Sequence, residues 1–242
     1  MAQLEVTRHG RISVLTLKRP EHGNRLSGEL ADAVTANLKS ARTDPAIGAC
    51  VMTGHGEVFC LGGDYQGAGP STADRREYAR ALIDMDHAMA RLAKPLIAAV
   101  NGDAHAGGFG VVIGCDLAVV AVDATLGLPE AANGLFPFIA LAIVKDALPK
   151  KVLFDLIYNA RLMSAEEARD LHVVNEVVPR AAVLDRAIEL AKHASSHNAE
   201  IVALGRDLYY RLRGVDPAEA LKESRIALLA ALTAKDRKSG SD

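Results

Sequence analysis

The chain has 242 residues, of which 50% are hydrophobic and 24% are charged, and its formal net charge at pH 7 is -2. This length allows one sizeable core with a small appended region, and the composition is typical of a soluble globular protein. The near-neutral charge and the scattered Lys and Arg residues give no electrostatic case for a nucleic-acid partner.

Five short apolar runs predict strands, and the first two form a hairpin: residues 4–7, 12–17, 49–53, 96–100 and 117–121. Ser27 is placed to cap a helix after the hairpin, and a second helix ends near Arg91. From Ile139 onward the pattern is almost entirely helical, apart from an extended segment at 172–178. Strands alternating with helices, followed by helices alone, indicate an α/β fold with a helical C-terminal region.

This order of elements suggests how the chain is divided. We expect a core over residues 1–190 that holds the functional site. A helical region over 191–242 would then serve oligomer contacts or act as a lid.

The cysteines and the apolar segments indicate in which compartment of the cell the protein is expected. Cys50, Cys60 and Cys115 are odd in number and widely spaced, so they fit neither a disulfide framework nor a zinc site. Residues 1–18 lack the pattern of a signal peptide, and the longest apolar stretch, 113–122, is too short to cross a bilayer. We therefore expect a cytoplasmic protein that does not associate with a membrane.

Two glycine-rich loops follow two of the predicted strands on the same plan. Gly62-Gly63 comes after the strand at 49–53, and Gly107-Gly108 comes after the strand at 96–100. A single pair of glycines is more often a tight turn packed against its neighbours. Two such loops at matching strand ends favour a ligand site, because parallel strands deliver them to one edge of the sheet.

One kind of site that glycines form is a dinucleotide site. Gly108-Phe109-Gly110 with Gly114 resembles the dinucleotide fingerprint. However, residues 101–107 separate these glycines from the strand, and no acidic residue follows at the expected place. We expect no NAD site and no separate cofactor. The chain also lacks G-x-S-x-G and H-E-x-x-H, so nothing supports a serine hydrolase or a metal enzyme.

The two loops can instead supply two backbone N–H donors. Gly107 begins a helical stretch, so its N–H points outward with the positive end of the helix dipole behind it. Gly63, from the other loop, is the second candidate donor. Two converging donors would hold a thioester carbonyl, and would hold it more strongly as its oxygen becomes anionic.

Five short motifs follow one another in the first 130 residues: Asn24-Arg25-Leu26, Phe59-Cys60-Leu61-Gly62-Gly63-Asp64, Asn101-Gly102 with Ala106-Gly107-Gly108, Cys115-Asp116-Leu117, and Gly127-Leu128-Pro129-Glu130. Their order and spacing resemble those of the crotonase superfamily, the enoyl-CoA hydratases and isomerases of fatty acid metabolism. Segments 161–168 and 174–179 are also similar. The resemblance implies a spiral of ββα units followed by helices, assembled as a homotrimer or a dimer of trimers. It also implies acyl-CoA thioester substrates.

The resemblance further implies roles for single residues. Gly63 and Gly107 match the oxyanion donors, and coenzyme A enters as part of the substrate. The residues expected to contact that substrate are Arg25, Leu61, Asp64, Tyr65, Pro129 and Phe136. Asp64 is also expected to cap a turn or the next helix, and Phe136 has a second interpretation as part of the plain core.

Hydratases of this family use two glutamates, and only one of them has a counterpart here. Glu130 matches one position, whereas the other falls on Gly110, which has no side chain. With Glu130 alone, the simplest chemistry is a single-base proton shuttle that moves a double bond, an enoyl-CoA isomerase reaction. An apolar pocket would raise the pKa of such a carboxyl. Without the resemblance, Glu130 would be taken for a solvent-facing glutamate in a loop.

Three other possibilities stay open at this level. A second group could restore hydratase chemistry, and His105 is the first candidate, although its position favours packing under the loop. Asp103 and Glu57 are weaker candidates, because both are expected at the surface. The chain could also be an acyl-CoA binding protein without catalysis, or a structural partner subunit.

Overall fold

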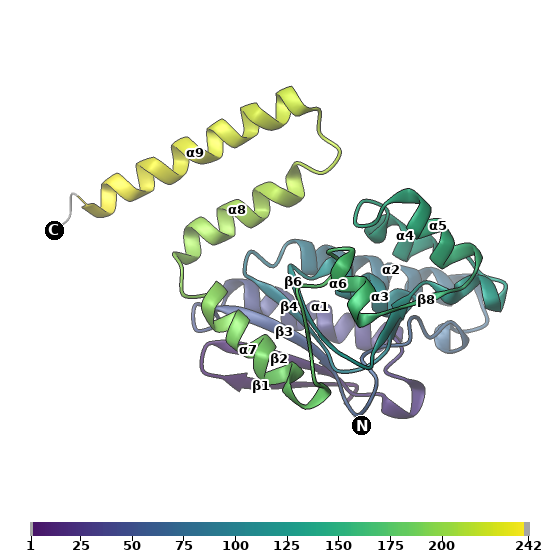
Figure 1. Cartoon of the computed structure of the whole chain (residues 1–242). Helices are drawn as coiled ribbons and strands as arrows, with labels where there is room; N and C mark the ends of the chain where they lie inside the picture. Colours follow the sequence, from purple (N-terminus) through teal and green to yellow (C-terminus); the bar gives the residue numbers. More distant parts are fainter. Residues whose placement is uncertain (1, 240–242) are drawn as a thin grey trace.

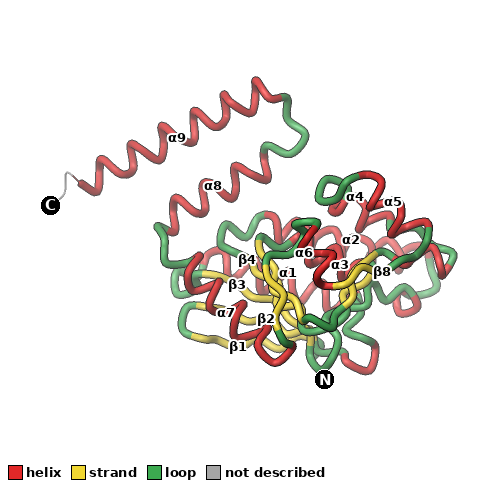
Figure 2. Tube along the Cα trace, in the orientation of Figure 1, coloured by secondary structure: helices red, strands yellow, loops and turns green. Residues whose placement is uncertain are grey.

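The structure, a computed structural model, describes residues 2–239 of the chain. In this part of the chain the strands form two sheets with helices around them (Figure 1; Figure 2). The larger sheet contains, in spatial order, β1 (Leu4–His9), β2 (Ile12–Leu17), β3 (Ala49–Gly54), β4 (Leu96–Val100), β6 (Leu117–Ala121) and β9 (Glu176–Val178). The smaller sheet contains β5 (Ala104–His105), β7 (Thr125–Gly127) and β8 (Leu162–Ser164).

The larger sheet is parallel except at one edge. β1 and β2 form an antiparallel hairpin, and every later strand joins its neighbour in parallel. All residues of β3 and β4 are buried, as expected where helices cover a parallel sheet on both faces. The hairpin and the three apolar strands predicted from the sequence are confirmed.

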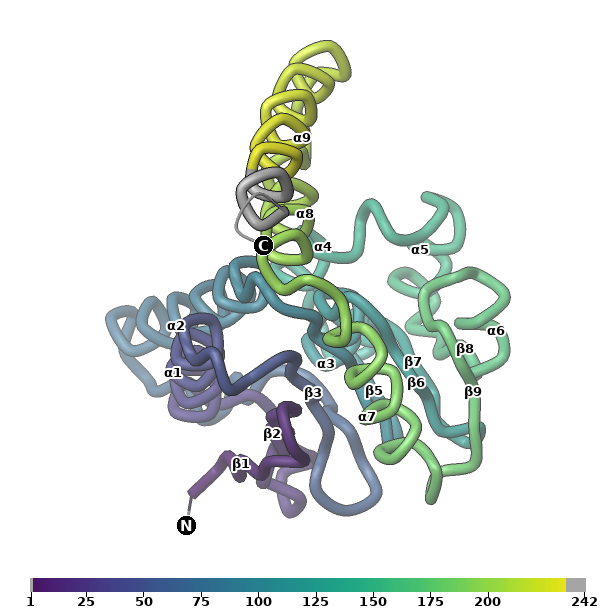
Figure 3. Tube along the Cα trace, turned by 90° about the vertical axis from the view of Figure 1, so that its left-hand side faces the viewer, coloured from purple at the N-terminus to yellow at the C-terminus, as the bar shows by residue number. Residues whose placement is uncertain are grey.

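The helices of the described residues are α1 (Gly28–Thr43), α2 (Thr72–Ala90), α3 (Gly107–Gly114), α4 (Phe138–Val144), α5 (Lys150–Tyr158), α6 (Ala165–Asp170), α7 (Val183–Ala194), α8 (Ala199–Arg211) and α9 (Pro217–Ser239). Short 3-10 turns are η1 (Pro20–His22), η2 (Gln66–Ala68), η3 (Pro129–Asn133) and η4 (Arg180–Ala182). Ser27 caps α1 as predicted, because its side chain accepts a hydrogen bond from the Leu30 N–H at 3.1 Å. α1 and α2 lie side by side, and α7 packs along β3, β4 and β6 (Figure 3).

Three short strands escape prediction from the sequence. β5, β7 and β8 have only two or three residues each, too few to establish an alternating pattern. β5 lies inside the second glycine loop, and the extended segment expected at 172–178 is a strand only at its end, in β9. These short strands position the loop between β4 and α3.

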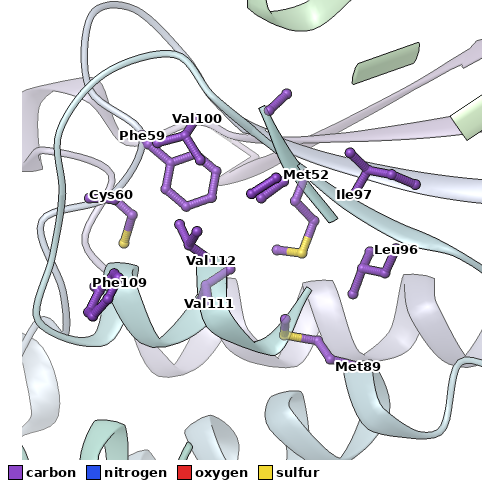
Figure 4. Close-up of a cluster of buried hydrophobic side chains, with 14 of the residues drawn as sticks. Met52, Phe59, Cys60, Met89, Leu96, Ile97, Val100, Phe109, Val111 and Val112 are labelled. Atoms are coloured by element: carbon purple, nitrogen blue, oxygen red, sulfur yellow. The ribbon is translucent and has the colours of Figure 1, made fainter. Parts of the chain in front are cut away.

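Apolar packing holds the first glycine loop against α3. Figure 4 shows Phe59 and Cys60, which come from that loop, beside Phe109 and Val112 of α3. Phe59 and Phe109 are the largest fully buried side chains of the protein within the described residues. Because protein interiors are close-packed, this cluster leaves the two loops little freedom to move relative to each other.

The last two helices stand away from the body of the protein (Figure 1; Figure 3). α8 is tied to the core by Arg206, whose guanidinium donates to the Asp116 carboxylate at 2.8 Å and to the backbone carbonyls of Met89 and Ala90. Within the described part of the chain, no helix has both the length and the apolar character needed to cross a bilayer.

Candidate functional site

Three segments that are distant in the sequence meet at one edge of the sheet. The backbone N–H of Cys60 donates to the Asp103 carbonyl at 3.1 Å, and the His105 N–H donates to the Cys60 carbonyl at 3.0 Å. Leu26 joins the same loop, because its N–H donates to the Gly62 carbonyl at 2.8 Å. Backbone hydrogen bonds therefore connect three of the five sequence motifs.

Glycine is required where the loops meet. Gly62 has φ +105°, and a Cβ there would lie only 2.7 Å from the Ala106 Cβ. A Cβ on Gly63 would collide with the Tyr78 hydroxyl, and one on Gly108 would overlap the Cys60 carbonyl. The loops thus approach each other more closely than side chains allow.

The amides of Gly63 and Gly107 lie close together and are available to an acceptor. A Cβ placed on Gly107 would lie 3.6 Å from the Gly63 nitrogen. Gly107 is the first residue of α3, so its N–H has no partner inside the helix. The Gly63 N–H donates no backbone hydrogen bond among residues 2–239, since the bonds to Leu26 use its two neighbours instead. Such a pair of donors can stabilise negative charge on a bound oxygen.

Ala106, directly before Gly107, has an unusual backbone conformation. Its φ of 54° and ψ of -126° lie outside the regions that side chains favour. Its N–H donates to the Gly127 carbonyl at 2.8 Å, which ties this residue to β7. The surrounding structure therefore holds the start of α3 in a strained geometry, a feature often found at functional sites.

Glu130 follows β7 in the turn η3 and is buried, with 5% of its surface exposed. Its Oε2 atom has no hydrogen-bond partner within the described residues. Burial raises the pKa of Glu130 to about 6, and a hydrogen bond with its own backbone acts in the opposite sense. The interpretation of Glu130 as a solvent-facing loop residue is therefore wrong.

A cavity of about 630 Å³ opens beside Glu130. Eight residues singled out in the sequence line it: Arg25, Leu61, Gly63, Asp64, Tyr65, His105, Pro129 and Glu130 itself. Tyr65 is close enough to Glu130 to sense its charge, because burial raises the pKa of Tyr65 and the Glu130 carboxylate raises it further. The structure thus brings most of the expected substrate residues together with the carboxylate.

Asp64 is engaged in the protein rather than free. It forms an ion pair with Arg19 at 2.8 Å in a largely buried setting, and it accepts a hydrogen bond from the Gly67 N–H. Burial alone would raise the pKa of Asp64, but the hydrogen bonds from Arg19 and Gly67 hold it below its usual value. The expected turn-capping role is observed. The sequence did not identify Arg19, because it lies 45 residues from Asp64 and belongs to no motif.

A second, apolar pocket shares Gly63 and Tyr65 with the cavity beside Glu130. It has room for about 40 Å³, or roughly three water-sized groups, between α2, α3 and α4. Gly63, Gly107 and Gly110 border it at one end, and Ile139 and Ile143 border it from α4. Ala140, on the same helix, also lines this pocket.

Phe136 does not line either cavity. It packs against the buried core, and its ring lies 5.8 Å from that of Phe138. This position fits its interpretation as a core residue, and its contact with substrate remains a prediction. Gly110 packs toward α4, where a Cβ would lie 3.6 Å from the Ala140 Cβ.

His105 lines the same cavity as Glu130 and has a defined hydrogen-bond chain behind it. The Thr125 hydroxyl donates to Asp103 at 2.8 Å, so it accepts from Nε2 of His105, also at 2.8 Å. Nε2 therefore carries the proton, and Nδ1 is left as an acceptor. Burial lowers the pKa of His105, against the opposing charge of Asp103, so the ring is neutral at pH 7. Glu57, the third candidate group, is exposed and lies outside both cavity linings.

The fold and the site correspond to a class of acyl-thioester enzymes. The family model for enoyl-CoA hydratase/isomerase matches residues 7–241. The chain therefore belongs to the enoyl-CoA hydratase/isomerase family of enzymes, as the five motifs predicted.

Individual relatives agree with this assignment. The chain is 35% identical over 199 residues to the enoyl-CoA hydratase EchA19 of Mycobacterium tuberculosis, which covers 79% of this chain and 74% of that protein. It is 32% identical to a carnitinyl-CoA dehydratase of Salmonella enteritidis, over 85% of this chain and 79% of that one. The crystal structure of an enoyl-CoA hydratase of Mycobacterium smegmatis superposes with a TM-score of 0.90 at 28% identity, covering 95% of this chain and 91% of that one. The expected crotonase fold is confirmed.

The close approach of Gly62 to Ala106 can be tested by substitution. Gly62→Ala places a Cβ against Ala106 in a backbone conformation that side chains disfavour. We expect the free energy of unfolding to fall by about 1–3 kcal/mol. Turnover of an enoyl-CoA should fall at least about tenfold, because displacing the loop misplaces the Gly63 donor. Urea unfolding and a spectrophotometric assay measure the two effects.

Gly28→Ala is the matched control, since its Cβ would point into open space at the start of α1. It should change stability by less than about 1 kcal/mol and leave turnover intact. Equal activity of the Gly62→Ala variant and the wild type would contradict the importance of this contact.

Proposed function

We propose that the protein is an enoyl-CoA isomerase that moves a double bond with one carboxylate, Glu130. The observation that carries the proposal is the buried Glu130 carboxylate, which lines one cavity with Gly63 and has an oxygen without a hydrogen-bond partner in residues 2–239. The position of a second carboxylate is Gly110, which faces α4. A single base that can take up and return the same proton suits a reaction with no net change in composition.

The reaction would proceed in two proton transfers. The Glu130 carboxylate removes a proton from C2 of a 3-enoyl-CoA, and the electron pair moves into the thioester, giving a dienolate. The N–H groups of Gly63 and Gly107 hold the negative oxygen. The Glu130 carboxyl then returns the proton to C4, which yields the 2-enoyl-CoA. Its pKa of about 6 lets the side chain serve as base and as acid near neutral pH.

The rest of the substrate would occupy the large cavity. We assign Arg25, Leu61, Asp64, Tyr65 and Pro129 to contacts with the coenzyme A moiety, because they line the space next to Glu130. Arg25 already donates to the Leu61 carbonyl at 2.6 Å, which holds its side chain along the cavity wall. The acyl chain would enter the apolar pocket bordered by Gly107 and α4, and the contact with Phe136 belongs to the same proposal.

A second candidate is hydration of a 2-enoyl-CoA, the activity that the name of the M. tuberculosis relative states. His105 favours it, because its ring is neutral, lines the cavity of Glu130 and presents Nδ1 as an acceptor. In that reaction Nδ1 would take a proton from the water that attacks C3. Glu130 would then protonate C2.

We also propose that the helical region 191–242 makes contacts with further copies of the chain in a homotrimer or a dimer of trimers, while residues 1–190 hold the site. α9 exposes large apolar side chains that single soluble chains usually cover: Leu221, Ile226, Leu228, Leu229 and Leu232. Light scattering after size exclusion should give about three or six times the chain mass of 25.6 kDa. A mass of one chain would contradict the proposal.

We place the protein in the cytoplasm. Cys50, Cys60 and Cys115 are free, and burial raises the pKa of Cys50 to about 12 and that of Cys60 to about 11. Protonated thiols inside a core are unreactive, and unpaired cysteines are common in reducing compartments. Fractionation of the source cells would test the location.

Replacing Glu130 tests the isomerase proposal. Glu130→Gln should lower the turnover of a 3-enoyl-CoA by roughly 10²–10⁴-fold, because the amide cannot accept the proton. In the wild type, kcat/KM should rise with pH through about 6 and then level off, since the base must be ionised. The 2-enoyl product is followed by absorbance. Unchanged turnover in the variant would rule out the single-base mechanism, and binding without turnover in the wild type would indicate a non-catalytic acyl-CoA binder.

Two further measurements sharpen this test. Glu57→Gln removes an exposed carboxyl outside the cavity, so its activity should match the wild type.

The pH dependence of stability provides the other measurement, because the pKa of Glu130 in the native state lies above its value in the unfolded chain, 4.5. The native state therefore binds more protons, and stability should fall by about 2 kcal/mol as pH rises from 4.5 through 6. Glu130→Gln should lack this part of the pH dependence.

Replacing His105 separates the two candidate reactions. Crotonyl-CoA and a 3-enoyl-CoA are incubated with the wild type and with His105→Gln. The isomerase proposal expects the 3-enoyl-CoA to react in both proteins and no 3-hydroxyacyl product to accumulate. If crotonyl-CoA gives a 3-hydroxyacyl product that His105→Gln abolishes, the hydratase is correct and the isomerase proposal fails.

A further inference from the structure

One acidic side chain lies at the far end of the apolar pocket. Asp86 of α2 is the only charged residue in the described lining, and its neighbours there include Leu82, Met85 and Met89. A Cβ placed on Gly114, the last residue of α3, would lie 3.9 Å from the Asp86 Oδ1 atom. The pocket therefore begins at the first residue of α3, Gly107, and reaches Asp86 at the other end of that helix.

Asp86 has no hydrogen bond or ion pair within residues 2–239, although it is half-buried. Asp84, on the same helix, forms an ion pair with Arg80. His87 and Arg213 are near enough to influence the pKa of Asp86, but the Arg213 guanidinium lies 4.8 Å from the centre of the Tyr210 ring. Burial raises the pKa of Asp86, and His87 and Arg213 act in the opposite sense. The Asp86 carboxyl group is therefore free of protein partners within the described residues and available to a hydrogen-bond donor of a ligand.

We propose that Asp86 recognises a hydrogen-bond donor, a hydroxyl or an ammonium group, at the far end of the substrate's acyl chain. The proposal rests on the proposed function in one respect: the thioester must lie at Gly63 and Gly107. The chain would then run along α3 toward Gly114. Asp86 accepts the terminal donor, and Leu82 and Met85 contact the methylene groups on the way.

The length of α3 sets the length of that chain. Gly114 lies seven positions after Gly107 along α3, so the pocket extends roughly 10 Å at 1.5 Å per residue. An extended chain advances about 1.1–1.2 Å per bond, and the terminal hydrogen bond covers part of the distance. A substituent on about the sixth to eighth atom reaches Asp86. The pocket holds roughly three water-sized groups in this structure, so the Leu82 and Met85 side chains must turn aside to admit the favoured substrates, medium-length acyl thioesters with a polar end.

The position of Asp86 excludes it from the proton transfers of the proposed reaction. It lies about one helical turn beyond Gly110, and it does not line the cavity that contains Glu130. Its other side borders a groove of about 1010 Å³ formed with α8, which gives the carboxylate access to water when the pocket is empty. Asp86 thus acts on substrate choice and leaves the proton transfers to Glu130.

Calorimetry with saturated thioesters tests the proposal on the full chain. Hexanoyl-CoA, 6-hydroxyhexanoyl-CoA and 6-aminohexanoyl-CoA are titrated into the wild type. At least one polar ligand should bind about tenfold more tightly than hexanoyl-CoA, because a hydrogen bond to a charged group favours it. The polar ligand that binds more tightly shows whether Asp86 prefers a hydroxyl or an ammonium donor. Equal or weaker binding of both polar ligands overturns the proposal.

Two variants show whether Asp86 causes the preference. Asp86→Leu should remove it and bind hexanoyl-CoA at least as tightly as the wild type does. If this variant does not fold, Asp86→Asn should reduce the preference to about threefold, because its amide oxygen still accepts a hydrogen bond but carries no charge. Asp84→Asn is the matched control and should keep the full preference. A preference that survives both Asp86 substitutions overturns the assignment.

Binding of saturated thioesters needs no turnover, so the result separates this inference from the proposed function. A tenfold preference without isomerase activity supports Asp86 and refutes the isomerase. Isomerase activity without a preference for a polar ligand supports the isomerase and refutes the role of Asp86. Failure of every acyl-CoA to bind refutes both.

Discussion

The close approach of two backbone segments, at Cys60 and at the start of α3, is the constraint on which the rest of the site depends. It requires glycine at 62 and 108, because any side chain there would overlap Ala106 or the Cys60 carbonyl. Parallel pairing of β3 and β4 delivers both segments to one edge of the sheet, and packing of Phe59 against α3 keeps them there. The two free amides at Gly63 and Gly107 are a consequence of this approach.

The two titratable side chains of the cavity, His105 and Glu130, differ in their hydrogen bonding. His105 has a hydrogen-bond chain through Thr125 to Asp103, whereas Glu130 keeps one oxygen without a partner in a buried position. An unsatisfied buried carboxylate costs stability, and proteins retain such costs at functional sites. In the apolar pocket, α4 packs against Gly110. The absence of a side chain at position 110 is therefore part of the packing of the apolar pocket.

Much of the fold could be predicted because its signals are local. Apolar runs gave β2, β3, β4 and β6, and a serine cap gave the start of α1. The strands β5, β7 and β8 could not be predicted, because two or three residues carry no periodicity and their pairing is decided by distant segments. The hydrogen-bond partners of the site residues could not be predicted either, because Arg19 lies 45 residues from Asp64 and Thr125 lies 20 residues from His105.

The sequence alone determined the family, and it predicted Gly63 and Gly107 as donors and Glu130 as the one carboxylate, because motifs in fixed order specify backbone geometry and chemistry at their own positions. Tertiary structure decided what surrounds them. Only the packing of η3 buries Glu130, and only the meeting of α2 with the end of α3 brings Asp86 to the apolar pocket. Burial and pairing depend on contacts between segments far apart in the chain, so no local pattern encodes them.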